Sequence, residues 1–188
     1  MKQKSSAKYI LQLALTLLLI TGVVAAALAG INSLTAKRIA ENQQAKSWQA
    51  VQKVVPGAII SGEVAFTDTT GTVKSVQAVY ETGYVVEVAP TGFGGTITML
   101  VGVSYEGKVL GVAVVSQTET AGLGAVVAAD NQAGETFREQ FVGLSGVLAV
   151  TKDGGDIDSV TGATISSRAV VAGVNAALSC VANLNQQG

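Results

Sequence analysis

Histidine is absent from this chain of 188 residues, and cysteine occurs only once, as Cys180. The lack of histidine excludes a Ser-His-Asp triad and histidine-based acid–base catalysis. A lone cysteine excludes an intramolecular disulfide, zinc sites built from Cys and His, and cysteine-ligated iron–sulfur clusters. Any redox chemistry would therefore require an organic cofactor.

Charged residues are also scarce, at 13% of the chain, and the formal net charge is −1. No cluster of Lys and Arg interrupts this pattern, so nucleic acid is excluded as a partner. Cys180 lies in an apolar segment near the C-terminus, next to Ala176 and Ala177. We expect it to be a buried structural thiol.

The N-terminal region is the long apolar part of the chain. Residues 9–34 contain no charged residue, and residues 10–31 consist mainly of Leu, Ala, Val and Ile. This length can cross a bilayer as one helix. Residues 33–54 contain no Pro or Gly and favour a helix that continues out of the membrane. The expected organisation is a cytoplasmic tail (1–8), a transmembrane helix (9–31), a helical linker (32–55) and one folded domain (56–188).

A cleavable signal peptide is the alternative for the same region. Lys2, Lys4 and Lys8 form a basic start, and Ala27-Leu28-Ala29 is similar to a cleavage site. The apolar stretch is longer than a usual signal sequence, which favours a retained anchor. Basic residues lie on both sides of the span, so charge alone does not settle its orientation.

After Pro56-Gly57 the period of the apolar residues changes from helical to alternating. Segments rich in Val, Thr, Tyr and Ile predict antiparallel strands, a helix follows, and a short strand or extended lead-in precedes the last helix. Because no strict βαβ alternation is present, the predicted fold class is α+β. The predicted strands are 73–80, 84–89, 96–104 and 109–116, the helix is 135–142, and the lead-in is 157–160.

The last helix is predicted from apolar residues at spacings of four and three, which form one face. The segment before it reads Asp158-Ser159-Val160-Thr161-Gly162-Ala163-Thr164. Thr164 then falls in the first helical turn, where free N–H groups and the helix dipole favour an anion such as phosphate. A plain helix cap by the Thr161 or Thr164 hydroxyl is the alternative. The apolar face comprises Val170, Val174, Ala177, Val181 and Leu184.

This heptapeptide matches Asp-x-x-(Ser/Thr)-Gly-Ala-Thr, and the chain thereby resembles the FMN-binding-domain family. In that family the motif carries FMN on its last threonine through a phosphoester. Two further segments are similar to family elements, Gly92-Phe93-Gly94-Gly95 and the stretch 116–124, where Ala121 stands in place of the usual proline. The members that the chain resembles are the G subunit of the Rnf complex and the related NqrC subunit of the sodium-pumping quinone reductase.

The resemblance implies FMN attached covalently to Thr164 by a separate flavin transferase, which would recognise Asp158. It implies no catalytic residue and no metal ligand, because the protein part would only hold the flavin and tune it. Arg168, four residues after Thr164, either reaches back to the phosphodiester or lies solvated on the helix surface. The other expected cofactor-binding residues are Thr161, Gly162, Ala163, Gly94, Gly95, Glu119, Thr120, Gly122, Leu123 and Gly124.

As a function, the resemblance implies an electron relay in the cytoplasmic (inner) membrane, with the flavin domain on the extracytoplasmic side. Its partners would be the other membrane subunits of an Rnf-type complex, which couples electron transfer from ferredoxin to NAD with translocation of Na⁺ or H⁺. An NqrC-like subunit and a stand-alone electron-transfer flavoprotein are alternatives. A non-redox anchored binding module is the alternative from another class. A Ser/Thr-nucleophile enzyme is disfavoured, because no Lys neighbours Thr164 in sequence to act as a base.

Overall fold

The computed structural model describes residues 3–68 and 70–187. The chain divides after Ala45 into two units, and helix α1 (Gln3–Val54) contributes to both. In the first unit the stretch Lys8–Ala36 has a mean hydropathy of 2.4 and none of it is buried. It is therefore long and apolar enough to cross a membrane. The segments expected as a spanning helix and a linker belong to this one helix, whereas Lys2 lies outside the described residues.

The second unit is built on a five-stranded antiparallel sheet in which the strands follow chain order. This arrangement confirms the α+β prediction and the four predicted strands. The first strand was missed, because only four residues form it and three of them are exposed, so it has no alternating pattern. The strands are β1 (Ile60–Glu63), β2 (Val73–Val79), β3 (Gly83–Val88), β4 (Thr98–Ser104) and β5 (Val109–Ser116).

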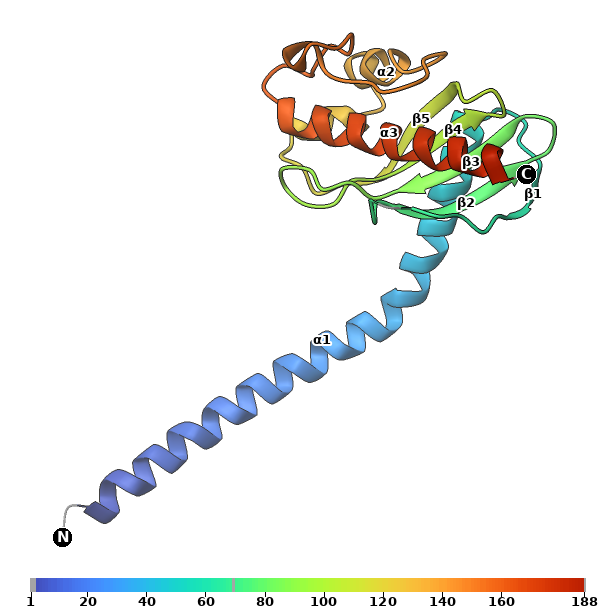
Figure 1. Cartoon of the computed structure of the whole chain (residues 1–188). Helices are drawn as coiled ribbons and strands as arrows, with labels where there is room; N and C mark the ends of the chain where they lie inside the picture. Colours follow the sequence, from blue (N-terminus) through green and yellow to red (C-terminus); the bar gives the residue numbers. More distant parts are fainter. Residues whose placement is uncertain (1–2, 69, 188) are drawn as a thin grey trace. The chain divides into compact units, whose positions relative to one another are not determined.

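Helix α3 (Thr164–Gln187) crosses one face of the sheet, as Figure 1 shows. Its apolar face is buried against β2, β3 and β4, with Val170, Val174 and Val181 each 0% exposed. Cys180 lies in the same core, and burial, followed by the negative charge of Asp68, raises the pKa of its thiol. The predicted helix and the structural role of the cysteine are thereby confirmed.

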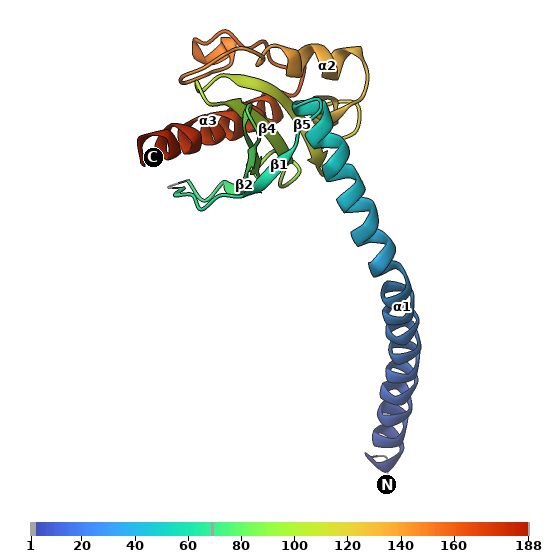
Figure 2. The ribbon, with the colours of Figure 1, turned by 90° about the vertical axis from the view of Figure 1, so that its right-hand side faces the viewer.

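The opposite face of the sheet is covered by the end of α1. Ala50, Val51 and Val54 pack there with sheet residues that include Val85 and Leu100. Figure 2 shows α3 and this end of α1 on opposite sides of the strands. The sheet thus has an apolar core on each face, and the final turns of the N-terminal helix belong to the folded domain.

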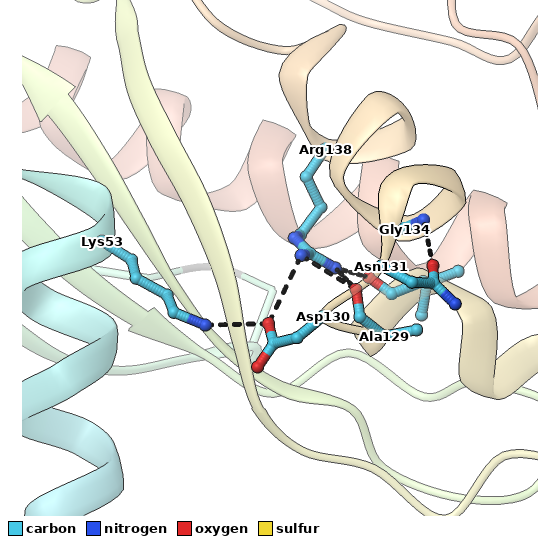
Figure 3. Close-up of polar contacts among 7 residues, drawn as sticks. Lys53, Ala129, Asp130, Asn131, Gly134 and Arg138 are labelled. Atoms are coloured by element: carbon cyan, nitrogen blue, oxygen red, sulfur yellow. Dashed lines mark hydrogen bonds and ion pairs between the residues drawn. The ribbon is translucent and has the colours of Figure 1, made fainter.

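Short helices join β5 to α3: the 3₁₀ helices η1 (Gly124–Ala128) and η2 (Thr151–Asp153), and α2 (Gln132–Glu139) between them. Asn131 caps α2, since its Oδ1 accepts a hydrogen bond from the Gly134 N–H at 3.0 Å (Figure 3). The predicted helix 135–142 therefore exists but begins three residues earlier. The segment 157–160 is an extended lead-in that makes a single bridge, between Ile157 and Val150.

Candidate functional site

Helix α3 begins at Thr164, the last residue of the heptapeptide. A turn precedes it, in which the Ala163 N–H donates to the Val160 carbonyl at 2.9 Å. Gly162 occupies this turn with φ +76°, a conformation that strains any residue with a side chain. The helix then opens with the bond from Ser167 N–H to the Ala163 carbonyl, also 2.9 Å. The N–H groups of residues 164–166 come before this first helical hydrogen bond, so they have no acceptor within the helix.

A threonine cap does not account for the motif. The residue before the helix is Ala163, which has no side-chain oxygen, and Thr161 is exposed. Among the described residues, neither Thr161 nor Thr164 accepts a hydrogen bond from a backbone N–H. Ser167 instead stabilises the turn, because its buried Oγ donates to the Ala163 carbonyl and accepts from the Val160 N–H, each at 3.0 Å. The start of a 24-residue helix therefore remains open to an anion.

The helix start forms one wall of a cavity of about 310 Å³. This volume lies at the lower end of the usual range for cofactor sites. The apolar side chains around it, Phe93, Leu123 and Ile165, are each about half exposed or more, so an apolar ring could be held at an open mouth. The cavity is lined by Phe93, Glu119, Thr120, Leu123, Gly124, Gly162, Ala163, Thr164, Ile165 and Ser166.

The cavity brings together three separate segments of the chain, around Phe93, the Glu119–Gly124 loop and the start of α3. Most of the residues expected from the sequence line it: Glu119, Thr120, Leu123 and Gly124 of the loop, and the last three residues of the motif. Gly94, Gly95 and Gly122 do not line it. Asp158 and Thr161 line a different cavity, of about 390 Å³. Phe93 lies in the glycine-rich element that resembles the family, although it was not expected as a contact, and Ile165 and Ser166 were not expected because they follow the motif within the helix.

Glu119 lines the cavity and also joins two elements of the fold. The residue is 8% exposed, and its two carboxylate oxygens accept hydrogen bonds from different elements. Oε1 accepts from the Gly94 N–H at 2.8 Å, and Oε2 accepts from the Ser166 hydroxyl in a short hydrogen bond. Glu119 thus ties the glycine loop before β4 to the first turn of α3.

Gly124 shows that close packing explains part of the glycine pattern. A Cβ atom at this position would lie 2.4 Å from the Ser166 Oγ and 2.6 Å from the Glu119 Oε2. The backbone can approach this hydrogen-bonded pair only without a side chain. The glycine therefore preserves the Glu119 clamp behind the cavity wall.

Lys152 is the site residue that sequence reasoning missed. Its Nζ donates a hydrogen bond to the Thr164 Oγ1 at 3.0 Å, although the two residues are 12 positions apart. Lys152 lies in η2, a three-residue 3₁₀ helix with no periodic signal. Only the folding of η2 against the start of α3 brings this ammonium group to the threonine.

Arg168 lies exposed on the helix surface, the second of the two positions expected for it, and it is paired there with Asp153. Its guanidinium forms a two-pronged ion pair with Asp153, in which Nε donates to Oδ2 at 2.7 Å and NH2 donates to Oδ1 at 2.5 Å. The hydrogen bond from Arg168 lowers the pKa of Asp153, and the same contact raises that of Arg168. The pair ties η2 to α3 one turn beyond Thr164.

The lead-in to the motif is held through its backbone. Gln140 accepts from the Asp158 N–H at 2.7 Å and donates to the Asp158 carbonyl at 3.2 Å. The Asp158 residue itself is exposed. Its carboxylate is thereby free for a partner while its backbone is fixed.

Comparison with known proteins gives the family. Residues 92–179 match the family model of the FMN-binding domain, and residues 1–54 match that of the RnfG N-terminal region. The first match spans both the glycine loop and the heptapeptide. The two matches together cover the N-terminal helix and every residue that lines the cavity, whereas residues 55–91 lie in neither match.

Curated relatives extend over almost the whole chain. The G subunit of the Na⁺-translocating ferredoxin:NAD⁺ oxidoreductase complex of Acetobacterium woodii is 31% identical, with 95% of each chain covered. The G subunit of the ion-translocating oxidoreductase complex of Shewanella baltica is 32% identical, over 88% of this chain and 84% of that one. The protein of the same name from Methanosarcina acetivorans is 32% identical, over 94% and 97%. The chain therefore belongs to the family of G subunits of ion-translocating oxidoreductase complexes, and it contains their FMN-binding domain.

Proposed function

We propose that this chain is a membrane-anchored electron carrier whose FMN is bound through a phosphoester to Thr164. The observation that carries the proposal is the position of the Thr164 hydroxyl, at the open start of α3 and on the wall of the cavity of about 310 Å³. An FMN-binding domain needs a place for a phosphate and a place for a flat apolar ring. Both lie next to this hydroxyl.

The residues present fit FMN. The free N–H groups at the start of α3 suit the phosphate. Phe93, Leu123 and Ile165 offer apolar surface to the ring, and Thr120 offers a polar group at the same cavity. When bound, FMN would accept and release electrons, while the protein would hold it and exclude water from part of its surface. Lys152 lies beside the Thr164 hydroxyl in the fold, at 3.0 Å, so the absence of a neighbouring lysine in sequence does not argue against a Ser/Thr nucleophile.

Maturation would need a partner that attaches the flavin. We assign this step to a flavin transferase that recognises Asp158, because the heptapeptide is the acceptor motif of the family that the chain resembles. The exposed position of Asp158 and its fixed backbone support this role. Thr161, at the exposed turn, belongs to the same presented surface.

The names of the relatives support membership in a complex. We infer that the chain works beside other membrane subunits in an Rnf-type complex, which couples electron transfer from ferredoxin to NAD with translocation of Na⁺ or H⁺. Residues 9–31 would cross the cytoplasmic membrane, with residues 1–8 on its inner side, residues 32–55 as a linker and residues 56–188 as the extracytoplasmic FMN domain. The apolar stretch Lys8–Ala36 supports this arrangement.

Denaturing gel fluorescence tests the attachment. The full chain, co-expressed with a flavin transferase, should give a fluorescent band that survives SDS, and Thr164→Ala should abolish it because the accepting oxygen is removed. Thr82→Ala is the matched control, since it removes a hydroxyl in the turn between β2 and β3, outside the motif and the cavity, and should leave a labelled band. An unlabelled wild-type chain would favour the anchored binding module and overturn the proposal.

A further inference from the structure

In the part of the chain that the structure describes, two cations lie near Thr164, and only one of them is paired with a carboxylate. Arg168 is already neutralised by Asp153, whereas Lys152 donates to the Thr164 Oγ1. Across residues 3–68 and 70–187, no carboxylate lies within ion-pair distance of the Lys152 ammonium. One uncompensated positive charge therefore lies at the threonine, beside the positive end of the α3 dipole.

A positive charge in this position has no structural purpose in the unmodified chain. Lys152 is exposed, and a lysine in water gains little from a single bond to a neutral hydroxyl. Together with the free N–H groups at the helix start, it forms a place where an anion on the Thr164 oxygen would be doubly stabilised. A phosphodiester at that oxygen carries one negative charge, which matches the one free cation.

We propose that η2 is a phosphate clamp, in which Lys152 neutralises the phosphodiester on Thr164 and the Arg168–Asp153 pair positions η2 so that it can. This inference rests on the proposed attachment of FMN to Thr164. Lys152 would hold the hydroxyl before modification, and its flexible four-carbon stem would let the ammonium follow the new phosphate oxygens. Arg168 acts through Asp153 and is a positioning residue, not a ligand of the phosphate.

The geometry of η2 explains why two residues are needed. Lys152 and Asp153 are neighbours, so a bond that fixes Asp153 to α3 also fixes the backbone from which Lys152 extends. Thr164 and Arg168 lie one helical turn apart on α3 and therefore present their side chains on the same side. The two contacts form parallel ties between η2 and the first two turns of the helix.

The test compares chains with and without attached FMN. Full-length wild type, Lys152→Met and Lys152→Arg are prepared in both forms, and the melting temperature of each is measured at low and high salt. At low salt, attachment of FMN should raise the melting temperature of both chains. The rise should be about 2 °C smaller for Lys152→Met than for wild type, because the variant cannot form the exposed charge pair. Lys152→Arg should restore most of the gain, and the difference should close at high salt. Lys74→Met, at an exposed lysine in β2, is the matched control and should gain as much as wild type.

The phosphorus NMR signal of the attached group is the second measurement. Its chemical shift should differ between wild type and Lys152→Met, and Arg168→Met should move it in the same direction. In the double variant Lys152→Met/Arg168→Met the two changes should not add, because both remove one contact. The inference would be overturned if Lys152→Met had the same phosphorus chemical shift as wild type and the same gain in melting temperature on attachment. An unlabelled wild-type chain would instead overturn the proposed attachment, so the two failures are distinguishable.

Discussion

At the scale of single residues, Glu119 shows how one cavity-lining residue can also hold the walls of the site together. The sequence suggests that its carboxylate offers hydrogen bonds to a cofactor. In the folded protein both oxygens are already used, by the Gly94 N–H and the Ser166 hydroxyl. Glu119 therefore fixes the spacing between two walls of the cavity. Its replacement should lower the free energy of unfolding.

Replacing Glu119 with alanine should lower the free energy of unfolding by about 2–4 kcal/mol, because the buried Ser166 hydroxyl and the Gly94 N–H lose their acceptor and a cavity remains. Urea denaturation of the unlabelled chain would measure the change. Glu119→Gln is the matched control and should lose less, because the amide keeps one acceptor oxygen and its NH₂ group can donate to the Ser166 oxygen. If Glu119→Ala unfolded at the urea concentration of wild type, the clamp would have no energetic role.

At the scale of elements, the end of α1 is tied to the η1–α2 segment by charged residues. Figure 3 shows Lys53 and Arg138 on either side of Asp130, with Arg138 also directed at Ala129. Lys53 Nζ lies 2.8 Å from Asp130 Oδ1, and this hydrogen bond lowers the pKa of Asp130. Arg138 is more buried, and it donates to the carbonyls of Val127 at 2.9 Å and Ala129 at 3.1 Å. The two cations are therefore unequal, although both lie near the same carboxylate.

Arg138→Met should cost about 1.5–3 kcal/mol of stability, because it leaves carbonyl oxygens of the η1–α2 connection without their charged donor. Lys53→Met should cost less than about 1 kcal/mol, because Lys53 and Asp130 are both exposed and their pairing is weak in water. Thermal unfolding of the two variants side by side would measure the difference. Equal losses would mean that the Asp130 pair, and not the carbonyl contacts, holds the segment.

At the scale of the whole molecule, one helix serves two environments. The stretch Lys8–Ala36 is apolar all round and unburied, whereas Ala50, Val51 and Val54 in the same helix are core residues of the FMN-binding domain. Helix α3 also has the length and apolar content of a membrane span, but most of it is buried in the core. Apolar composition therefore indicates a candidate membrane span in α1 and a core helix in α3, and the burial of each helix distinguishes the two cases.

A retained anchor predicts that the mature protein keeps its N-terminal segment. Intact mass measurement of the protein purified from membranes should give the full chain, without cleavage after Ala29, because the apolar stretch exceeds the length of a signal sequence. Added protease should digest the FMN domain in spheroplasts but not in inverted vesicles if the domain is extracytoplasmic. A mature chain that begins at Gly30 and is released from membranes would contradict the anchor.

The sequence by itself determined the fold class, four of the five strands, the C-terminal helix and the position of Thr164 at its start. Each of these depends on local periodicity or on residues adjacent along the chain, and such signals survive without tertiary contacts. The resemblance carried by the heptapeptide and the Glu119–Gly124 loop also gave the family, which the relatives confirm.

Only the tertiary structure decided which side chains meet at Thr164. Lys152 reaches it from 12 residues away, Arg168 is taken by Asp153, and Glu119 faces Ser166 across 47 positions. These pairings come from the folding of irregular loops against a helix start, where no period predicts which residues will be neighbours. The sequence therefore identified the position of Thr164 at the helix start, whereas the charged surroundings of this residue depend on long-range packing.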